Sequence, residues 1–150
     1  MSQSLSKCVL HCVFSTKDRY PFLEGDLKNA MHGYLATVAR DLGCDDVLVG
    51  GMFDHVHLAL TLPRTLAVSV LMEKLKTPSS KWAKTQDSKL RRFAWQKGYG
   101  AFFVSPKDLG ALRHYIENQE EHHRVLSFQD EFRRFLKRYD VPFDERYVWE

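Results

Sequence analysis

The sequence lacks the features that mark secreted, membrane-spanning and disulfide-stabilised proteins. No apolar run approaches the roughly 20 residues that a membrane-spanning helix needs. No N-terminal stretch combines basic residues, a long apolar run and a small-residue cleavage site. The 150 residues include three cysteines, an odd number, and two of them, Cys8 and Cys12, lie within an apolar run. We therefore expect a reduced, cytoplasmic protein without a disulfide framework and without a membrane partner.

Internal repeats, low-complexity tracts and linker-like segments are also lacking. A chain of 150 residues has the length of one ordinary domain, and its 44% apolar and 13% aromatic residues are enough to bury a core. We expect a single domain over residues 1–150.

The basic residues are distributed unevenly along the chain. The formal net charge is +3, yet eight basic residues and a single acid, Asp87, lie between Lys74 and Lys97, so this segment carries +7 and the remainder −4. Two tryptophans and a phenylalanine are interleaved with these bases. A groove that neutralises phosphates and stacks unpaired bases has this composition. A solvated, charged helix and loop has it as well.

Hydrophobic periodicity and turn residues predict alternating strands and helices. Strand-like runs occupy residues 8–14, 46–49, 53–62, 92–96 and 100–105. Apolar residues at helical spacing predict helices over residues 24–42, 65–76, 106–124 and 128–139. Gly50-Gly51 is the expected hairpin turn, and residues 77–80 are expected to close the second helix.

The order β-α-β-β-α-β-β-α predicts an α+β fold of the ferredoxin-like kind. In this fold an antiparallel sheet carries the first two helices on one face. The other face is then free to hold a functional site.

Two histidines share one face of the predicted strand 53–62. Because side chains alternate along a strand, His55 and His57 point away from the face that rests on the helices. The residues predicted to face the helices are Val56, Leu58, Leu60 and Leu62. Two adjacent imidazoles can chelate one divalent ion. A His-x-His pair on a strand is more often two polar side chains at the protein surface that bind no metal, so a metal site needs further ligands.

The predicted helix 106–124 offers such donors. Its buried stripe is Leu109, Leu112 and Ile116. Tyr115, Gln119 and His122 fall on a neighbouring face. If this helix lies over the helix-free face of the sheet, Gln119 can supply a third metal ligand and Tyr115 a nucleophilic hydroxyl. The alternative is a half-buried tyrosine beside a polar neighbour.

These motifs resemble those of a known family. Phe53-Asp54-His55-Val56-His57-Leu58 resembles the His-hydrophobe-His motif of the HUH nucleases. Tyr115-Ile116-Glu117-Asn118-Gln119 resembles the catalytic-helix motif of their single-tyrosine transposases, the insertion sequence 200/605 family, which includes REP-associated tyrosine transposases. Shorter stretches that resemble the same family, in its order, are residues 13–17, 79–82, 95–100 and 144–147. The resemblance is nearly chain-long.

The resemblance implies a metal-dependent enzyme that cleaves and rejoins single-stranded DNA with hairpin ends. Magnesium or manganese would be held by His55, His57 and Gln119, and Tyr115 would attack phosphorus to form a 5′-phosphotyrosine. Rejoining would need no nucleotide cofactor. The family's working unit is a homodimer whose sheets join edge to edge.

Four basic residues are candidate DNA contacts, because bases in loops at the ends of a sheet commonly hold phosphates. They are Lys17, Arg19, Lys81 and Arg92.

The remaining polar residues near the motifs have several interpretations. Asp54 is expected to face the helices, where it closes the hairpin or hydrogen-bonds a histidine. His122 is a candidate proton carrier or fourth ligand, whereas His114 and His123 are expected to face solvent. The pattern of the strand that contains His11 does not indicate to which face of the sheet this side chain points.

The strongest rival from another class is a non-catalytic ferredoxin-like module that binds nucleic acid. Such modules display aromatic residues on their central strands, whereas the central strand here displays His55 and His57. This difference favours the nuclease. A structural or partner-binding protein would show no dependence on Tyr115.

Overall fold

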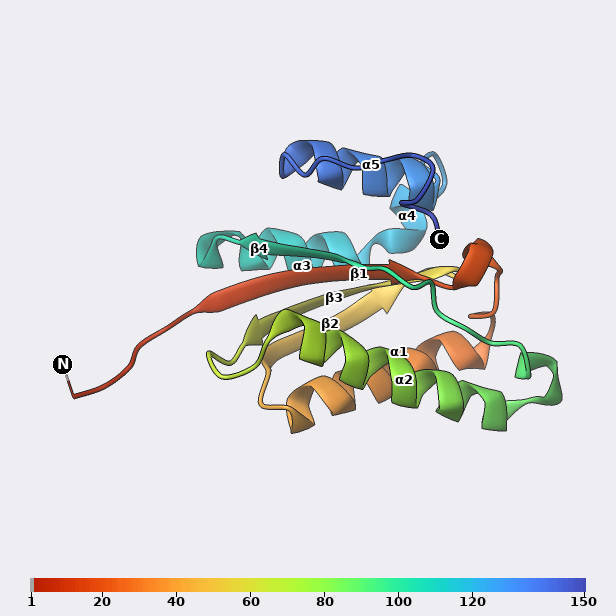
Figure 1. The fold of residues 1–150 in the computed structure, drawn as a ribbon, viewed down its shortest axis with the longest axis horizontal. Helices are drawn as coiled ribbons and strands as arrows, with labels where there is room; N and C mark the ends of the chain where they lie inside the picture. Colours follow the sequence, from red (N-terminus) through yellow and green to blue (C-terminus); the bar gives the residue numbers. More distant parts are fainter. Residues whose placement is uncertain (1) are drawn as a thin grey trace.

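The computed structural model describes residues 2–150 as a central sheet between two helical layers (Figure 1). The sheet consists of β1 (Cys8–Ser15), β2 (Asp45–Gly51), β3 (His55–Leu62) and β4 (Gly100–Val104). The helices are α1 (Asp26–Asp41), α2 (Val68–Gln86), α3 (Leu109–Glu117), α4 (Gln119–His122) and α5 (Phe128–Arg138). All strand pairs are antiparallel, in the order β2-β3-β1-β4. The predicted α+β class is therefore confirmed.

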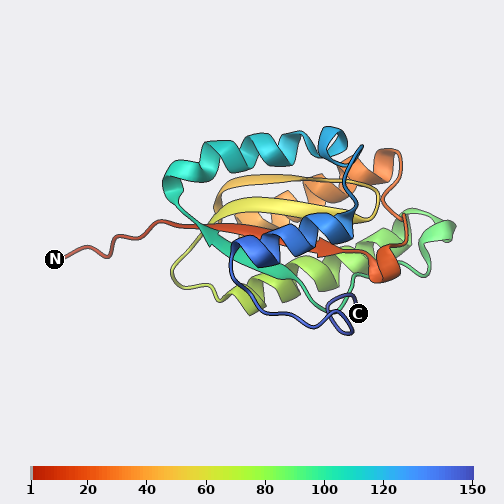
Figure 2. The same cartoon turned by 90° about the horizontal axis from the view of Figure 1, so that it is seen from above.

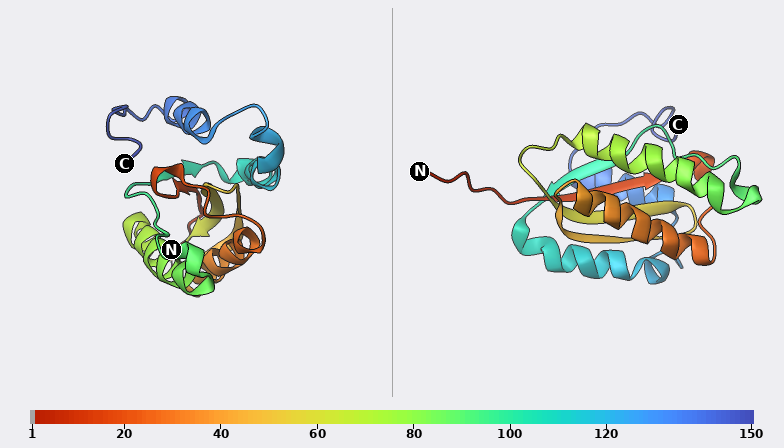
Figure 3. Two further views of the ribbon diagram at one scale, coloured as in Figure 1. Left: turned by 90° about the vertical axis from the view of Figure 1, so that its right-hand side faces the viewer. Right: turned by 90° about the horizontal axis from the view of Figure 1, so that it is seen from below.

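One face of the sheet rests on α1 and α2, which run across it side by side (Figure 3). The core between them contains the apolar side of β3, Val56, Leu58, Leu60 and Leu62, as the alternation predicted. Leu35 of α1 and Leu71 and Leu75 of α2 are fully buried against this layer. Packing of these apolar faces fixes the orientation of β3 and sends its odd-numbered side chains to the opposite face.

The opposite face is covered by α3 on one side and α5 on the other (Figure 2). Helix α3 lies over β2 and β3, and the backbone of Ile116 approaches Gly50 so closely that a Cβ on that glycine would lie 2.7 Å from the Ile116 carbonyl oxygen. Helix α5 covers β1 and β4 through a second apolar cluster, Val13, Phe102, Phe128, Phe132 and Leu136. The space between the sheet, α3 and α5 holds the polar residues described below.

The predicted strand 92–96 is wrong. This segment makes only one isolated bridge, between Trp95 and Thr16. Phe93 and Trp95 are both buried in the core with α1 and α2, and the buried carboxamide of Gln96 accepts a hydrogen bond from the Ser15 amide at 2.5 Å. The side chains thus anchor an irregular segment. It pairs with the end of β1 and the residues after it through this bridge alone, where the Gln96 amide donates to the Ser15 carbonyl and the Lys17 amide donates to the Ala94 carbonyl.

The second helix is longer than predicted, because α2 continues through Pro78 to Gln86. A proline in a helix interior removes one backbone hydrogen bond. The next residue, Ser79, donates its hydroxyl to the Leu75 carbonyl at 2.5 Å and accepts from the Trp95 indole at 2.9 Å. Burial of Leu75, Ser79 and Ala83 against the sheet outweighs the loss of that bond.

Two further boundaries differ from the sequence prediction. Gly50 and Gly51 are paired within β2, so the hairpin turn consists of residues 52–54. The predicted helix 106–124 is interrupted at Asn118, whose side chain donates to the His114 carbonyl at 2.7 Å. Asparagine side chains compete for backbone partners in this way and interrupt helices.

Among residues 2–150, no helix is both long and apolar enough to span a bilayer.

The close approach of α3 to β2 predicts opposite effects for two glycine-to-alanine substitutions. Gly50→Ala should lower the free energy of unfolding by about 1–3 kcal/mol, because the new methyl group collides with Ile116. Gly33→Ala, at an exposed position of α1 with open space around it, should raise that energy by about 0.5–1 kcal/mol. Urea unfolding of both variants measures the difference. Equal stability of Gly50→Ala and the unaltered protein would contradict the described docking of α3.

Candidate functional site

Strand β3 places two imidazoles beneath the outer helices. His55 and His57 have no solvent exposure, and both belong to the face opposite α1 and α2. The His55 ring stacks on Phe128 of α5, with ring centres 4.6 Å apart. The sequence correctly predicted the face, whereas the complete burial results from α5.

The short helix α4 brings an amide next to His55. Oε1 of Gln119 lies 3.1 Å from Nε2 of His55 and 3.1 Å from Nε2 of His123. Gln119 is itself buried. The structure therefore juxtaposes Gln119 with the histidine pair, as expected from the sequence, and adds His123, which was expected to face solvent. That expectation is wrong because the chain turns after α4 and carries His123 back toward the sheet.

Helix α5 adds a carboxylate that the sequence analysis missed. Glu131 is 1% exposed. Its Oε1 accepts a hydrogen bond from Nε2 of His57 at 2.8 Å and lies 3.6 Å from Nε2 of His55. Its Oε2 lies 3.2 Å from Nε2 of His123 and 3.4 Å from the Gln119 amide nitrogen. One carboxylate thus contacts side chains from β3, α4 and the loop after α4.

A signal for Glu131 was present in the sequence. The buried positions of α5 are Phe128, Glu131, Phe132 and Leu136. They follow the i, i+3, i+4, i+8 spacing of an apolar helix face. An acidic residue on such a face is buried with it, and a buried carboxylate needs a partner.

Tyr115 of α3 completes the cluster. Its hydroxyl donates a hydrogen bond to Oε2 of Glu131, and its ring meets the His57 ring edge-on at 5.8 Å between centres. His122 packs on the Tyr115 ring at 4.5 Å and is not among the residues around Glu131. The predicted nucleophile and the histidine pair therefore meet within one chain, across the Glu131 carboxylate.

The Nδ1 atom of each imidazole, which points away from Glu131, has its own hydrogen-bond partner. Nδ1 of His55 donates to the Asp54 carboxylate at 2.7 Å, and Nδ1 of His123 donates to the Leu126 carbonyl at 2.7 Å. Nδ1 of His57 lies 2.8 Å from Nε2 of the buried His11. Partners of this kind fix ring orientation at metal sites and direct Nε2 toward the ion. The expectation that Asp54 faces α1 and α2 is wrong, because its side chain turns to His55.

Burial and charge shift the pKa values of these groups in different directions. Burial alone would raise the pKa of Glu131, but hydrogen bonds from His123 and His57 hold it well below its usual range. Burial and the Glu131 charge raise the pKa of the Tyr115 phenol above its usual value. Burial also lowers the pKa of His11 to about 3, so this imidazole is neutral and can donate to or accept from His57.

Four side chains form a possible site for a divalent metal ion. One ligand atom from each of His55, His57, His123 and Glu131 lies within 4.8 Å of the others. The hydrogen bond to Asp54 leaves Nε2 of a neutral His55 without a proton, so its lone pair faces the Gln119 oxygen. The His55 nitrogen and the Gln119 oxygen then both present lone pairs to each other, and a cation bound by both atoms stabilises this contact. Imidazole nitrogens, an amide oxygen and a carboxylate are all common ligands of divalent metal ions.

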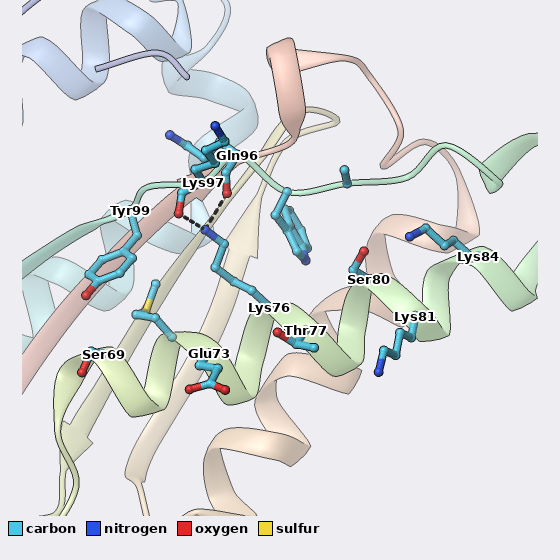
Figure 4. A pocket seen from close by; sticks show the side chains of 13 residues that line it. Ser69, Glu73, Lys76, Thr77, Ser80, Lys81, Lys84, Gln96, Lys97 and Tyr99 are labelled. Carbon is cyan, nitrogen blue, oxygen red and sulfur yellow. Dashed lines mark hydrogen bonds between the residues drawn. The ribbon is translucent and has the colours of Figure 1, made fainter. Parts of the chain in front are cut away.

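A separate basic groove lies between α2 and residues 94–99 (Figure 4). Its volume is about 520 Å³. Lys76, Lys81, Lys84 and Lys97 line it together with Trp95 and Tyr99. The Lys76 amine is already engaged, because it donates to the carbonyls of Gln96, Lys97 and Gly98 at 2.6, 3.1 and 2.8 Å, and burial lowers its pKa to about 8.

The four candidate DNA contacts do not form one cluster. Lys81 lines the basic groove, whereas Arg92 lies outside it. Lys17 and Arg19 belong to the turn after β1, and the Arg19 guanidinium lies 5.9 Å from the centre of the Trp149 ring.

Comparison with known proteins identifies a family and a curated relative. The sequence profile of the family described as "Transposase IS200 like" matches residues 4–119. The ISDra2 transposase TnpA of Deinococcus radiodurans is 23% identical over 116 residues, which are 74% of this chain and 83% of that protein. The profile covers β3 and Tyr115 and ends at Gln119, so Glu131 lies outside it.

Two solved structures share the fold. A crystal structure from Deinococcus radiodurans, assigned as a transposase, covers 79% of this chain and 98% of its own, with a TM-score of 0.62 and 23% identity. A REP-associated tyrosine transposase bound to a REP hairpin covers 96% of this chain and 93% of its own, with a TM-score of 0.54 and 18% identity. The second likeness extends into the segment after residue 119.

Proposed function

This chain belongs to the IS200-like transposase family, and from that premise we propose that it cleaves and rejoins single-stranded DNA through a covalent bond to Tyr115. The observation that carries the proposal is the convergence of the Tyr115 hydroxyl and the His55–His57 pair on the Glu131 carboxylate. DNA with hairpin ends is the proposed substrate, because a structural neighbour is bound to a REP hairpin.

His55, His57 and Gln119 hold a divalent metal ion in this proposal, and Glu131 adds an anionic oxygen. When bound, magnesium or manganese polarises the scissile phosphate and stabilises its developing charge. Asp54 and His11 keep the two β3 imidazoles aimed at the centre through their Nδ1 atoms.

Tyr115 is the nucleophile. Its oxygen loses its proton and attacks phosphorus, the bond from phosphorus to the 3′-oxygen breaks, and the leaving oxygen takes up one proton in exchange, which gives a 3′-hydroxyl. The hydrogen bond to Glu131 fixes the phenol before attack. Through this contact the carboxylate orients the hydroxyl. Reversal of the attack by another 3′-hydroxyl rejoins DNA without a nucleotide cofactor.

The basic groove beside α2 is the proposed track for DNA phosphates. Lys81, Lys84 and Lys97 present ammonium groups there, and Tyr99 offers an exposed aromatic face. Arg92 and the two residues of the turn after β1, Lys17 and Arg19, are proposed as further contacts outside this groove.

The homodimer and the cytoplasmic location also belong to the proposal. Strand β4 is an edge strand, and its Phe103 is 58% exposed, which suits pairing of two sheets. The nucleophile does not need a second chain, because Tyr115 meets the histidines of its own chain. Cys8, Cys12 and Cys44 are free thiols, as in a reducing compartment.

The covalent step predicts a labelled protein band. A single-stranded oligonucleotide from the DNA that flanks the protein's own gene, labelled at its 3′ end, should form a covalent adduct in the presence of manganese, because the 5′ phosphate of the downstream fragment stays on the tyrosine. Tyr115→Phe should lose the adduct and retain DNA binding, and chelation of the metal should also abolish it. A denaturing gel measures adduct formation, and a native gel measures binding.

Tyr34→Phe is the matched control, since Tyr34 stacks on Trp82 on the opposite side of the sheet. It should form the adduct normally. An adduct in Tyr115→Phe would refute the nucleophile. Tight binding without any adduct would favour the non-catalytic nucleic-acid-binding module.

The phosphate track predicts a change in salt dependence. Lys81→Ala should weaken binding of single-stranded DNA and reduce the slope of log K against log salt by about 0.7, the value for one lost phosphate contact. Lys74→Ala changes an exposed lysine of the same helix outside the groove and should leave the slope unaltered. Fluorescence anisotropy titrations at several salt concentrations test both variants. Equal slopes for Lys81→Ala and the unaltered protein would show that Lys81 contacts no DNA phosphate and that the DNA does not follow this groove.

A further inference from the structure

A second cavity opens from the active centre between α3 and α5. Its volume is about 400 Å³. His11 of β1 forms part of its floor, Ala111 and Tyr115 line the α3 side, and Phe135 lines the α5 side. Figure 2 shows these two helices next to each other over the same face of the sheet. Because Tyr115 is both the proposed nucleophile and a wall of this cavity, whatever occupies the cavity lies beside the reacting phosphate.

The inner part of the cavity is aromatic. The Phe135 ring stands edge-on to Tyr115, with ring centres 5.8 Å apart, and edge-on to His11 at 5.0 Å. Just after α5, Tyr139 also lines the cavity, and its ring stacks on Phe102 at 4.6 Å with an interplanar angle of 9°. These rings pack against aromatic neighbours and line the cavity, so they offer apolar surface for a flat ligand.

The outer part of the cavity is polar and carries both signs of charge. The exposed side chain of Arg138 lies 5.9 Å from the centre of the Tyr139 ring. Ser105 and Asp108, which precede α3, line the same cavity. A guanidinium binds phosphate, whereas a carboxylate repels it and accepts hydrogen bonds from the amino groups of cytosine or adenine.

We propose that this cavity receives the base of one of the two nucleotides that flank the scissile phosphate. The proposal rests on the function proposed above and specifies how the substrate is positioned. An unpaired base has flat faces for Phe135 and Tyr139 and a polar edge for Asp108 and Ser105. Its backbone phosphate then lies within reach of Arg138. A free phosphate fits less well, because the inner walls are aromatic and Asp108 is anionic.

The test combines a protein substitution that fills the cavity with a DNA substrate that lacks the base. Ala111→Phe places a ring into the cavity from an exposed position of α3. Once the cleavage position is mapped with the unaltered protein, abasic nucleotides are placed on each side of it in turn. At one of these two positions, removal of the base should lower kcat/KM about tenfold, the size of a lost base-stacking contact.

Ala111→Phe should lower kcat/KM for the complete substrate about tenfold and leave cleavage of that abasic substrate unchanged, since both changes remove the same contact. Unchanged cleavage of the abasic substrate also shows that the variant is folded. His114→Phe introduces the same ring at an exposed position of α3 outside the cavity and should cleave both substrates as the unaltered protein does.

Three outcomes would overturn the inference. In the first, Ala111→Phe lowers kcat/KM for the abasic substrate as much as for the complete one, which would mean that the new ring and the missing base act independently. In the second, removal of the base at either position leaves kcat/KM unchanged. The cavity then holds no base, whereas the proposed cleavage through Tyr115 is unaffected. If the unaltered protein cleaved no oligonucleotide, the proposed function itself would fail and this inference with it.

Discussion

Burial of the Glu131 carboxylate constrains the whole outer layer of the structure. Removing an ionised carboxylate from water costs several kcal/mol unless charged or polar partners replace the solvent. Here those partners come from three different elements: His57 from β3, Tyr115 from α3 and Gln119 from α4. Helix α5 can therefore dock in only one rotation and one register, and its apolar residues Phe128 and Phe132 bring the carboxylate to that point. The outer helices and the polar centre thus stabilise each other.

The same constraint connects the fold to the proposed chemistry. Strand β3 divides its side chains between an apolar core with α1 and α2 and a polar centre with α3 and α5. Each imidazole of that centre is held from behind, by Asp54, His11 or the Leu126 carbonyl, so the Nε2 atoms converge before any ligand arrives. Burial and the Glu131 charge raise the pKa of Tyr115 and so hold its proton in place. A cation that neutralises this charge would therefore also make the phenol easier to ionise.

Local patterns in the sequence were sufficient for the parts of the structure that depend on periodicity. Alternation along residues 53–62 gave the faces of His55 and His57. Helical spacing put Tyr115 and Gln119 on one face of their helix, and the position of that helix over the sheet remained a condition of the prediction. Contacts between distant segments were not accessible in this way. Burial of α2 against the sheet overrode the break expected at Pro78, and Phe93 and Trp95 turned into the core instead of extending a strand. His123 and Glu131 enter the centre only because the chain folds back after α4, although the acidic position on the apolar face of α5 was a readable signal.

The most direct test of the account is the position of a bound metal ion relative to Tyr115. Crystals of the Tyr115→Phe variant, grown with manganese and a single-stranded oligonucleotide from the ends of its gene, can be measured at a wavelength where manganese scatters anomalously. The account predicts one anomalous peak ligated by His55, His57 and Gln119, with the ring at position 115 directed at the phosphate beside it. A peak away from these side chains, or DNA bound with its phosphates remote from position 115, would contradict it.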